Sequence, residues 1–157
     1  MSKSLKRVKS ALETAGVPVN VLEMSGETRT AEQAAAQAGC KLDQIAKSIV
    51  FRGEGLIGAA LFITAGGNQV DPALATELVG TPLSRADANY VREMTGFAIG
   101  GVAPIAHKQP PTAFFDPRLL DFAQVFAAAG TPRHIFSIAP QMLLELSQSR
   151  SEVFVSA

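Results

Sequence analysis

Residues 47–63 read Lys-Ser-Ile-Val-Phe-Arg-Gly-Glu-Gly-Leu-Ile-Gly-Ala-Ala-Leu-Phe-Ile, which is two apolar segments separated by glycines. The segments 47–52 and 56–63 have the length and the apolar character of buried strands. Gly53 and Gly55 stand between them, where a hairpin turn would lie. The stretch therefore predicts a β-hairpin, and the rest of the chain adds helices and further strands around it.

Helical signals flank this hairpin on both sides. Leu5, Val8 and Leu12 recur at helical spacing, and Thr30 with Gln33 has the form of a capping box. Glycines end most of the helical segments, as expected for residues that adopt positive φ at helix C-termini. The predicted helices are 4–15, 31–38, 72–79, 86–94 and 140–146, and Asp43 is expected to cap one further turn.

Further strands are predicted at 18–23, 112–115, 125–128, 134–138 and 153–155. Helices and strands alternate irregularly, and several strand pairs look like hairpins. This order favours an α/β fold of the mixed α+β kind over a purely parallel doubly wound sheet. The length of 157 residues fits a single domain spanning 1–157 with a sizeable core.

The composition is that of an ordinary soluble protein, with 47% hydrophobic and 18% charged residues. Its 14 basic and 14 acidic residues balance, which argues against non-specific coating of nucleic acid and leaves room for a local basic patch. We expect no DNA-binding role. Cys40 is the only cysteine, no apolar stretch is long enough to span a membrane, and no signal peptide is visible. A cytoplasmic protein with no membrane partner is therefore expected.

The run Gly100-Gly101-Val102-Ala103-Pro104-Ile105-Ala106-His107 is the strongest candidate for a functional loop. Glycines allow a close approach of the backbone to a ligand, and the proline limits how the loop can relax. Successive backbone amides in such a turn can form a nest for an anion or an oxyanion. The loop therefore indicates chemistry that uses main-chain groups.

Other motifs have competing interpretations. Residues 53–58 match G-x-G-x-x-G, but strand-like residues follow, which favours a hairpin turn over a dinucleotide site. Cys40 is interpreted as a structural thiol and His134 as a packing residue. His107 could act directly in the chemistry or hold the loop, and both readings stay open. No spacing of ligands indicates a metal site.

Two charged positions and one helix remain as candidates. Lys47 could be an edge residue that snorkels, or a cation beside the glycine amides that favours a developing oxyanion. Asp116 precedes a proline and could be a turn or helix cap, or a carboxylate that holds an amine or a ribose hydroxyl. The basic residues of the N-terminal helix are a solvated face or a phosphate-contacting surface.

Several segments together resemble the YbaK/prolyl-tRNA editing family over nearly the whole chain. They occur in the family's order, and they are Thr30–Ala35, Ile45–Phe51, Thr95–Gly96, Gly100–Pro104 and Phe115–Asp116. The resemblance implies a free-standing domain with a mixed, partly barrel-like sheet surrounded by helices. It implies hydrolysis of the ester of mischarged tRNA, most often prolyl tRNA carrying alanine, cysteine or a similar small residue. It implies no metal and no cofactor.

The resemblance also implies roles for particular residues. The family's lysine maps onto Lys47 and its G-x-x-x-P loop onto residues 100–104, so we predict Lys47, Gly100 and Gly101 as catalytic. Predicted substrate-binding residues are Ser48, Val102, Pro104, His107 and Asp116. Ala106 departs from the family, since many relatives have glycine there. The implied partners are the acceptor end of mischarged tRNA and prolyl-tRNA synthetase.

These residues predict a mechanism in which the loop and the substrate's ribose hydroxyl position a water molecule. Backbone amides around Gly100–Val102 would stabilise the oxyanion, and Lys47 would favour the developing negative charge. His107 as general base is the competing assignment. A different class of function, a non-catalytic module that docks on a synthetase or a tRNA acceptor end, would share the fold without turnover.

Overall fold

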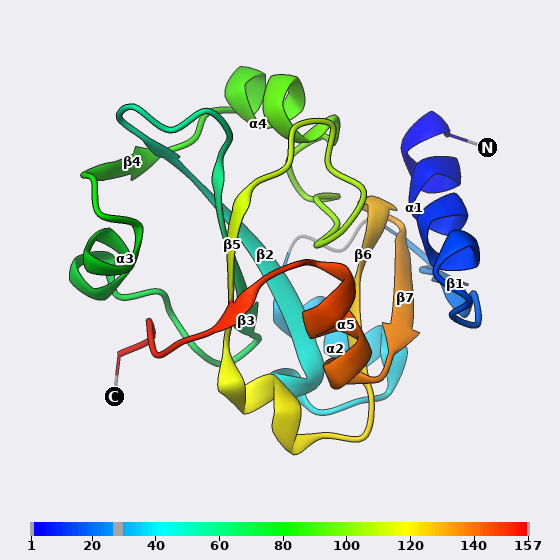
Figure 1. Cartoon of the computed structure of the whole chain (residues 1–157). Coiled ribbons are helices and arrows are strands. Elements are labelled where there is room, and N and C mark those ends of the chain that lie inside the picture. The colour runs from blue at the N-terminus through cyan, green and yellow to red at the C-terminus, as the bar shows by residue number, and fades with distance from the viewer. Residues whose placement is uncertain (1, 27–29, 157) are drawn as a thin grey trace.

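The structure is a computed structural model that describes residues 2–26 and 30–156 (Figure 1). The helices are α1 (Lys3–Thr14), α2 (Ala31–Ala38), α3 (Pro72–Val79), α4 (Ala88–Thr95) and α5 (Pro140–Leu146), with short 3₁₀ turns η1 (Leu42–Gln44) and η2 (Pro117–Asp121). The strands are β1 (Val21–Glu23), β2 (Ile45–Gly53), β3 (Ala60–Ala65), β4 (Leu83–Arg85), β5 (Thr112–Phe115), β6 (Val125–Thr131), β7 (His134–Ile138) and β8 (Arg150–Ser151).

All eight strands belong to one mixed sheet. Its order is β1-β7-β6-β2-β3-β5-β8, and β4 pairs with β2 off this path. The predicted hairpin lies at the centre, because β2 and β3 pair antiparallel from Ala46–Ala65 to Phe51–Ala60. The β2–β6, β3–β5 and β5–β8 pairings are parallel. The expectation of a mixed α/β fold is therefore confirmed.

One edge of β2 has an opening that positions the site. At its start, Ile45 and Ala46 pair with β6, and at its end the residues from Phe51 to Gly53 pair with β4. Between these two ladders, residues 47–50 have no strand partner on this edge within the described chain. Their main-chain and side-chain groups are therefore available to line a cavity.

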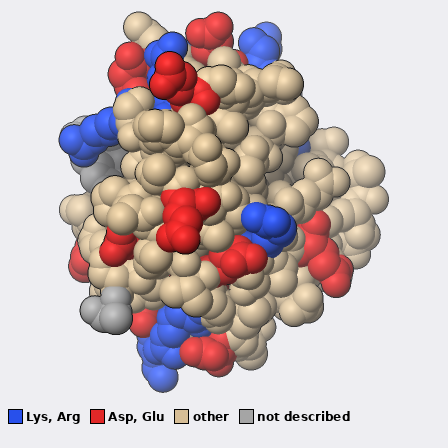
Figure 2. All heavy atoms as spheres, turned by 60° about the vertical axis from the view of Figure 1, so that its left-hand side comes forward, with Lys and Arg blue, Asp and Glu red and all other residues tan. Residues whose placement is uncertain are grey.

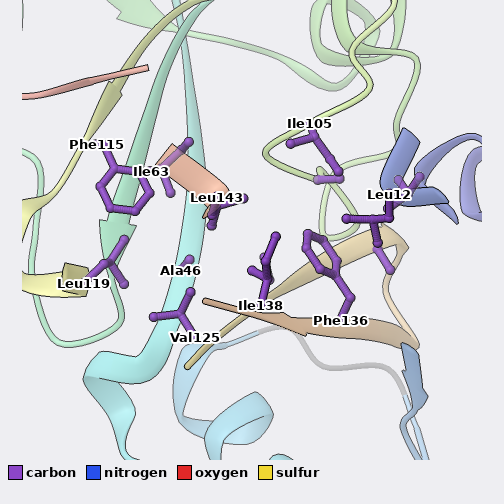
Figure 3. Close-up of a cluster of buried hydrophobic side chains, with 14 of the residues drawn as sticks. Leu12, Ala46, Ile63, Ile105, Phe115, Leu119, Val125, Phe136, Ile138 and Leu143 are labelled. Atoms are coloured by element: carbon purple, nitrogen blue, oxygen red, sulfur yellow. The ribbon is translucent and has the colours of Figure 1, made fainter. Parts of the chain in front are cut away.

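The main core lies between α1, α5 and one face of the sheet (Figure 3). Leu5, Val8 and Leu12 of α1 are all buried, which is the helical stripe that the sequence shows. Figure 3 shows Leu12 facing Phe136 of β7. Burial of each such side chain stabilises the fold by roughly 1.5–3 kcal/mol, so the core holds β6 and β7 against α1.

A second core lies around Phe62 of β3. Its ring centroid is 5.2 Å from that of Phe114 and 4.9 Å from that of Phe154. Phe154 belongs to the C-terminal segment, which was predicted to form a strand over 153–155. That prediction is wrong: the last strand is β8, and Val155 forms only an isolated bridge with Val70. The segment is held by the burial of Phe154 instead of by a ladder.

Local signals located most helix ends correctly. The side chains of Thr30 and Asp71 accept hydrogen bonds from the first turns of α2 and α3, and Gly39 and Gly80 end those helices with positive φ. The prediction that Asp43 caps a turn is wrong, because Lys41 is the N-cap of η1 and Asp43 lies within it. Non-local contacts engage the Asp43 carboxylate instead.

The hairpin turn is longer than the glycines suggested. β3 begins at Ala60 instead of residue 56, and Leu56 closes a turn by donating its amide to the Gly53 carbonyl at 3.2 Å. A strand follows the glycine-rich segment and no helix does, so residues 53–58 form a hairpin turn. The short strand β4, which pairs with the end of β2, was not predicted.

A left-handed residue after α5 provides a test of stability. Gln148 is exposed and has φ 52°, a conformation that favours glycine. We expect Gln148→Gly to raise the free energy of unfolding by about 0.5–1 kcal/mol. The matched change is Gly80→Ala, since Gly80 has φ 85° and open space around its Cβ position. It should lower the same quantity by about 1 kcal/mol in urea unfolding. If Gln148→Gly and Gly80→Ala changed the free energy of unfolding in the same direction, this account would be contradicted.

Candidate active site

A hollow of about 270 Å³ lies at the open edge of β2. Its apolar walls come from α2, β2, β6 and β7, and they include Ala31, Ala34, Ile45, Ile49, Phe126 and Ile135. Its polar wall is formed by Lys47 and Ser48 from β2 together with Gly100 and Val102 from the loop between α4 and β5. Four of the predicted site residues therefore meet in one cavity.

Lys47 is half-buried and supplies the cation of this hollow. Its Nζ donates a hydrogen bond to the main-chain carbonyl of Asn68, with an N–O distance of 2.7 Å. An ammonium group has three donors, so two remain for a ligand. Burial lowers the pKa of Lys47, while the carboxylates of Glu32, Asp116 and Asp43 partly offset that effect by raising it.

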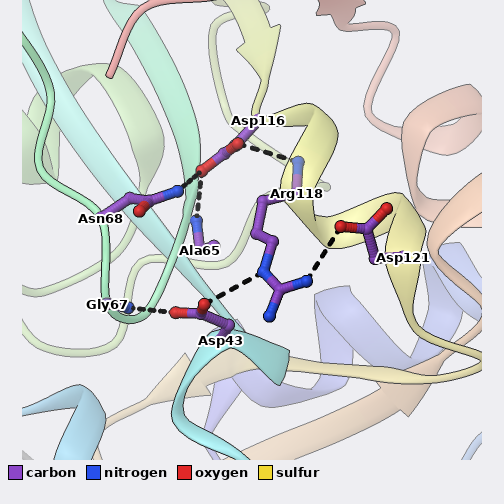
Figure 4. A network of polar contacts seen from close by, with 7 residues as sticks. All are labelled: Asp43, Ala65, Gly67, Asn68, Asp116, Arg118 and Asp121. Atoms are coloured by element: carbon purple, nitrogen blue, oxygen red, sulfur yellow. Dashed lines mark hydrogen bonds and ion pairs between the residues drawn. The ribbon is translucent and has the colours of Figure 1, made fainter. Parts of the chain in front are cut away.

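A polar network behind the hollow fixes the partner of Lys47 (Figure 4). Asp116 is 2% exposed, and its Oδ2 accepts hydrogen bonds from the Asn68 side-chain amide at 2.8 Å and the Ala65 main-chain amide at 3.1 Å. Its Oδ1 accepts from the Arg118 main-chain amide at 3.0 Å. Asp116 is therefore both the cap of η2 and the anchor of Asn68, and it does not line the hollow. A direct contact between Asp116 and substrate stays a prediction.

The outer part of this network joins three elements. The Arg118 guanidinium contacts the carboxylates of Asp43 at 3.1 Å and Asp121 at 2.9 Å. Asp43 also accepts a hydrogen bond from the Gly67 amide at 2.8 Å. These contacts tie η1 and η2 to the turn after β3, which is the turn that carries Asn68.

Ser48 follows Lys47 on β2 and lines the hollow. Its Oγ is buried and has no hydrogen-bond partner within the described structure. A buried hydroxyl without a partner costs free energy. The Ser48 hydroxyl is therefore, in the described structure, an unpaired polar group on a residue that lines the hollow.

The two glycines of the loop have different environments. Gly100 has φ 91° and lines the hollow. Gly101 is buried, its amide donates to the Ala98 carbonyl at 3.0 Å, and a Cβ there would lie 2.8 Å from the main chain of Thr131. Gly101 is thus required for the close approach of the loop to β6. In the described structure the amides of Gly100 and Val102 have no hydrogen-bond acceptor, so these two are available to a ligand.

His107 and Pro104 lie away from the Lys47 hollow and line a separate, smaller one of about 160 Å³. The His107 Nε2 donates to the Ala103 carbonyl at 2.6 Å, and its buried Nδ1 has no partner in the described structure. Burial lowers the pKa of His107; the hydrogen bond to Ala103 opposes this, and the charge of Arg7 adds to it. The ring is therefore held neutral against the loop, and a role as general base stays a prediction.

Arg7 of α1 holds the far side of the same loop. Its Nε donates to the Ala106 carbonyl at 2.8 Å, and a second guanidinium nitrogen donates to the Thr95 carbonyl at 3.0 Å. The guanidinium also lies 4.5 Å from the centroid of Phe97. Ala106, where many relatives were expected to have glycine, has φ 63°, so the Arg7 contact holds a strained residue.

Sequence reasoning missed Asn68 and Arg7. Asn68 follows two glycines after a strand, a pattern that signals a turn and says nothing about a carbonyl facing Lys47. Arg7 looked like one more cation on a basic helix. No group of three or more His, Cys, Asp or Glu side chains in the described chain could hold a metal ion. Within residues 2–26 and 30–156, no helix has the length and apolarity to cross a bilayer.

The lowered pKa of Lys47 can be measured directly. We expect the ¹³Cε resonance of Lys47 to titrate at a lower pH in the folded protein than in the chain unfolded in urea, because burial disfavours the ammonium form. The unfolded chain then binds more protons between the two pKa values, so this residue's contribution to stability rises with pH across that window. Lys47→Met should remove that rise. A Lys47 midpoint at or above the unfolded value would contradict the prediction.

The chain matches the model of the family described as "Aminoacyl-tRNA editing domain" over residues 25–146, and it belongs to that family. The match contains the whole hollow, including β2, the loop at 100–104 and β6. The predicted family resemblance is therefore confirmed.

Individual relatives cover nearly the full chain. The "Uncharacterized protein YwhH" of Bacillus subtilis (strain 168) is 34% identical over 147 residues, covering 94% of this chain and 93% of that protein. A solved structure described as "Crystal structure of a putative trans-editing enzyme for prolyl tRNA synthetase" is 45% identical, with a TM-score of 0.92 and coverage of 100% and 99%. The structure of "hypothetical protein APE2540" is 26% identical, with a TM-score of 0.87 and coverage of 96% and 99%.

Proposed function

We propose that this protein is a trans-acting aminoacyl-tRNA deacylase that hydrolyses the ester of mischarged tRNA, with prolyl tRNA carrying a small non-cognate amino acid as its substrate. The observation that carries the proposal is a hollow lined by Lys47 together with Gly100 and Val102, whose main-chain amides have no acceptor in the described structure. Membership in the editing family and the 45% identical structural relative support it.

In the proposed reaction, water attacks the ester carbonyl carbon. The carbonyl oxygen becomes an oxyanion, and the amides of Gly100 and Val102 donate to it. An oxyanion-hole donor of this kind stabilises the transition state by roughly 3–4 kcal/mol. The carbon–oxygen bond to the ribose then breaks, and the ribose oxygen takes up a proton. The products are free amino acid and tRNA with a free terminal hydroxyl.

Lys47 has an electrostatic role in this proposal. Lys47 lines the same cavity as Gly100 and Val102, and the bond of its ammonium to Asn68 leaves two N–H donors for the ribose or the phosphate of the terminal nucleotide. The substrate's neighbouring ribose hydroxyl assists the water, since the described hollow contains no histidine or carboxylate. Gly101, Pro104 and His107 shape the loop, and Asp116 acts through Asn68.

The size and the lining of the hollow support a small substrate side chain. About 270 Å³ is below the usual volume of a pocket for a drug-sized ligand, so it fits an aminoacyl group better than a whole nucleoside. Alanine and isoleucine side chains form much of the wall. Ser48 is the polar exception and is the proposed contact for the amino acid.

A deacylation panel tests the proposal. Prolyl tRNA is charged in turn with alanine, cysteine, serine, threonine, 2-aminobutyrate and proline, and the release of free amino acid by catalytic amounts of protein is measured. We expect multiple turnovers on the small non-cognate residues and slow release of proline. Stoichiometric binding without turnover would overturn the proposal and identify a non-catalytic module. A cytoplasmic role in translation fidelity and a link to prolyl-tRNA synthetase belong to the same proposal.

A further inference from the structure

A further cavity, a groove of about 550 Å³, lies between the first two turns of α1 and the tip of the β6–β7 hairpin. Lys9 lines it from α1 and Arg133 lines it from the hairpin tip, with His134 beside Arg133. The acidic residue in its lining is Glu23 of β1, whose Oε1 is 4.0 Å from the His134 Nε2. Cations from two distant parts of the sequence thus face one groove.

The charge pattern of α1 adds to this concentration of cations. Lys3, Lys6, Arg7 and Lys9 occupy its first two turns, and no acidic residue stands in its first turn. Cations near a helix N-terminus are disfavoured by the helix dipole, so this arrangement lowers the stability of the isolated helix. Arg7 turns to the loop at Ala106, whereas Lys3 and Lys6 are exposed on the helix that forms one wall of the groove. A polyanion bound along the helix would offset this repulsion.

The groove adjoins the proposed active site. Pro132 lines the groove and Gly100 lines the hollow, and a Cβ on Gly100 would lie 3.8 Å from the Pro132 side chain. The Ser4 Oγ donates to the Gly130 carbonyl at 2.7 Å, which fixes the start of α1 against the end of β6. The two cavities are thus close enough for one extended polyanionic ligand: its end would occupy the hollow, and the rest of it would continue past Pro132 into the groove.

Among the described residues, the groove's lining holds two cations, Lys9 and Arg133, and one carboxylate, Glu23. The chain has a formal net charge of zero. The face in Figure 2 shows blue and red side chains interspersed among uncharged ones. Phosphate attraction in such a protein depends on a local group of cations, since the overall charge supplies no attraction.

We propose that this groove binds the sugar-phosphate backbone of the RNA acceptor strand, with Lys9 and Arg133 as its central phosphate contacts and Lys3 and Lys6 extending it along α1. The inference rests on the proposed function, because the aminoacylated end of the same strand is assigned to the Lys47 hollow. The groove contributes affinity for RNA and orients the strand, and it takes no part in the chemistry.

The experiment measures binding of uncharged tRNA, which needs no deacylation, by fluorescence anisotropy at several salt concentrations. The test variant is Lys9→Gln with Arg133→Gln, and the matched control is Arg85→Gln with Arg92→Gln. Both remove two positive charges, and Arg85 and Arg92 are exposed on β4 and α4. We expect the test variant to bind on the order of tenfold more weakly near 50 mM salt. Its slope of log affinity against log salt should be smaller by about 1–2. The control should resemble the unmodified protein.

Two further measurements separate this inference from the proposed function. Thermal unfolding should show that both double variants are folded. On a mischarged substrate truncated to the terminal nucleotides, the test variant should retain the unmodified kcat/KM, whereas on full tRNA its KM should rise. If the test and control variants bound tRNA equally well while deacylation was intact, the proposed RNA-binding role of the groove would be overturned and the proposed function would stand. If tRNA binding depended on Lys9 and Arg133 but no deacylation was observed, the RNA-binding role of the groove would stand and the proposed function would be overturned.

Discussion

Lys47→Ala is expected to lower kcat/KM for deacylation by about two to three orders of magnitude. Loss of a preorganised charge-stabilising group from a transition state typically costs ~3–4 kcal/mol. Two of the three ammonium donors of Lys47 are available to the substrate, and the group shares its hollow with Gly100 and Val102. The measurement is single-turnover release of amino acid from mischarged prolyl tRNA with protein in excess but below saturation, where the rate constant divided by the protein concentration gives kcat/KM.

Two controls make this result specific. Lys47→Met keeps most of the side-chain volume and should be as inactive as Lys47→Ala, which would assign the loss to the charge. Lys41→Ala removes an exposed lysine shortly before the same strand and should retain full activity. Circular dichroism and urea unfolding should show that each variant is folded. A folded Lys47→Ala protein with normal deacylation would refute the proposed role of the ammonium.

Asp116→Ala is expected to have the largest effect on stability, a loss of about 3–5 kcal/mol in the free energy of unfolding. The change leaves the buried Ala65 amide, the Asn68 side chain and the Arg118 amide without their acceptor. Each unsatisfied buried group costs about 1–3 kcal/mol, and bonds to a charged acceptor are among the strongest. Typical domains have a total stability of only about 5–15 kcal/mol, so a urea titration should reveal the change clearly.

A conservative change tests whether Asp116 also positions Lys47. Asp116→Asn keeps the shape of the side chain but turns one acceptor into a donor, so Asn68 loses part of its anchor. We expect a folded protein with reduced kcat. Asp121→Asn, which alters only the exposed end of the Arg118 network, should keep both stability and activity. An Asp116→Asn protein with full activity would leave Asp116 a purely structural residue.

Gly101 has a structural role in the loop that affects how the activity of its variants is interpreted. From sequence, Gly101 was predicted as catalytic, with its amide among those that would stabilise the oxyanion. In the structure its amide is already bonded to Ala98, and a Cβ would collide with the main chain of Thr131. Inactivity of a Gly101 variant would therefore reflect a displaced loop. The amides of Gly100 and Val102, which have no acceptor in the described structure, are the ones to which the proposed function assigns oxyanion stabilisation.

Local chemistry made a large part of the fold predictable. The cap at Thr30, the glycines that end α2, α3 and α4, and the strands 112–115 and 134–138 agree with the structure. A cap or a turn involves atoms within about four residues, so the sequence contains nearly all of the information that places it. Two predictions were wrong, the strand over 153–155 and the cap at Asp43, because contacts with residues far away in the sequence decide the structure there. Phe154 is held by Phe62, and the Asp43 carboxylate by Gly67 and Arg118, all distant in sequence.

The sequence by itself determined the hairpin at residues 47–63, the mixed fold and the family, together with the identity of Lys47 and Gly100 as candidates. Tertiary structure alone decided that β2 leaves residues 47–50 open between β6 and β4, and that Lys47 meets the Asn68 carbonyl held by Asp116. It also decided that His107 faces Ala103, away from the hollow. The physical reason is that hydrophobic periodicity and capping act between near neighbours, whereas a site arises from contacts between strands and loops that only folding brings together.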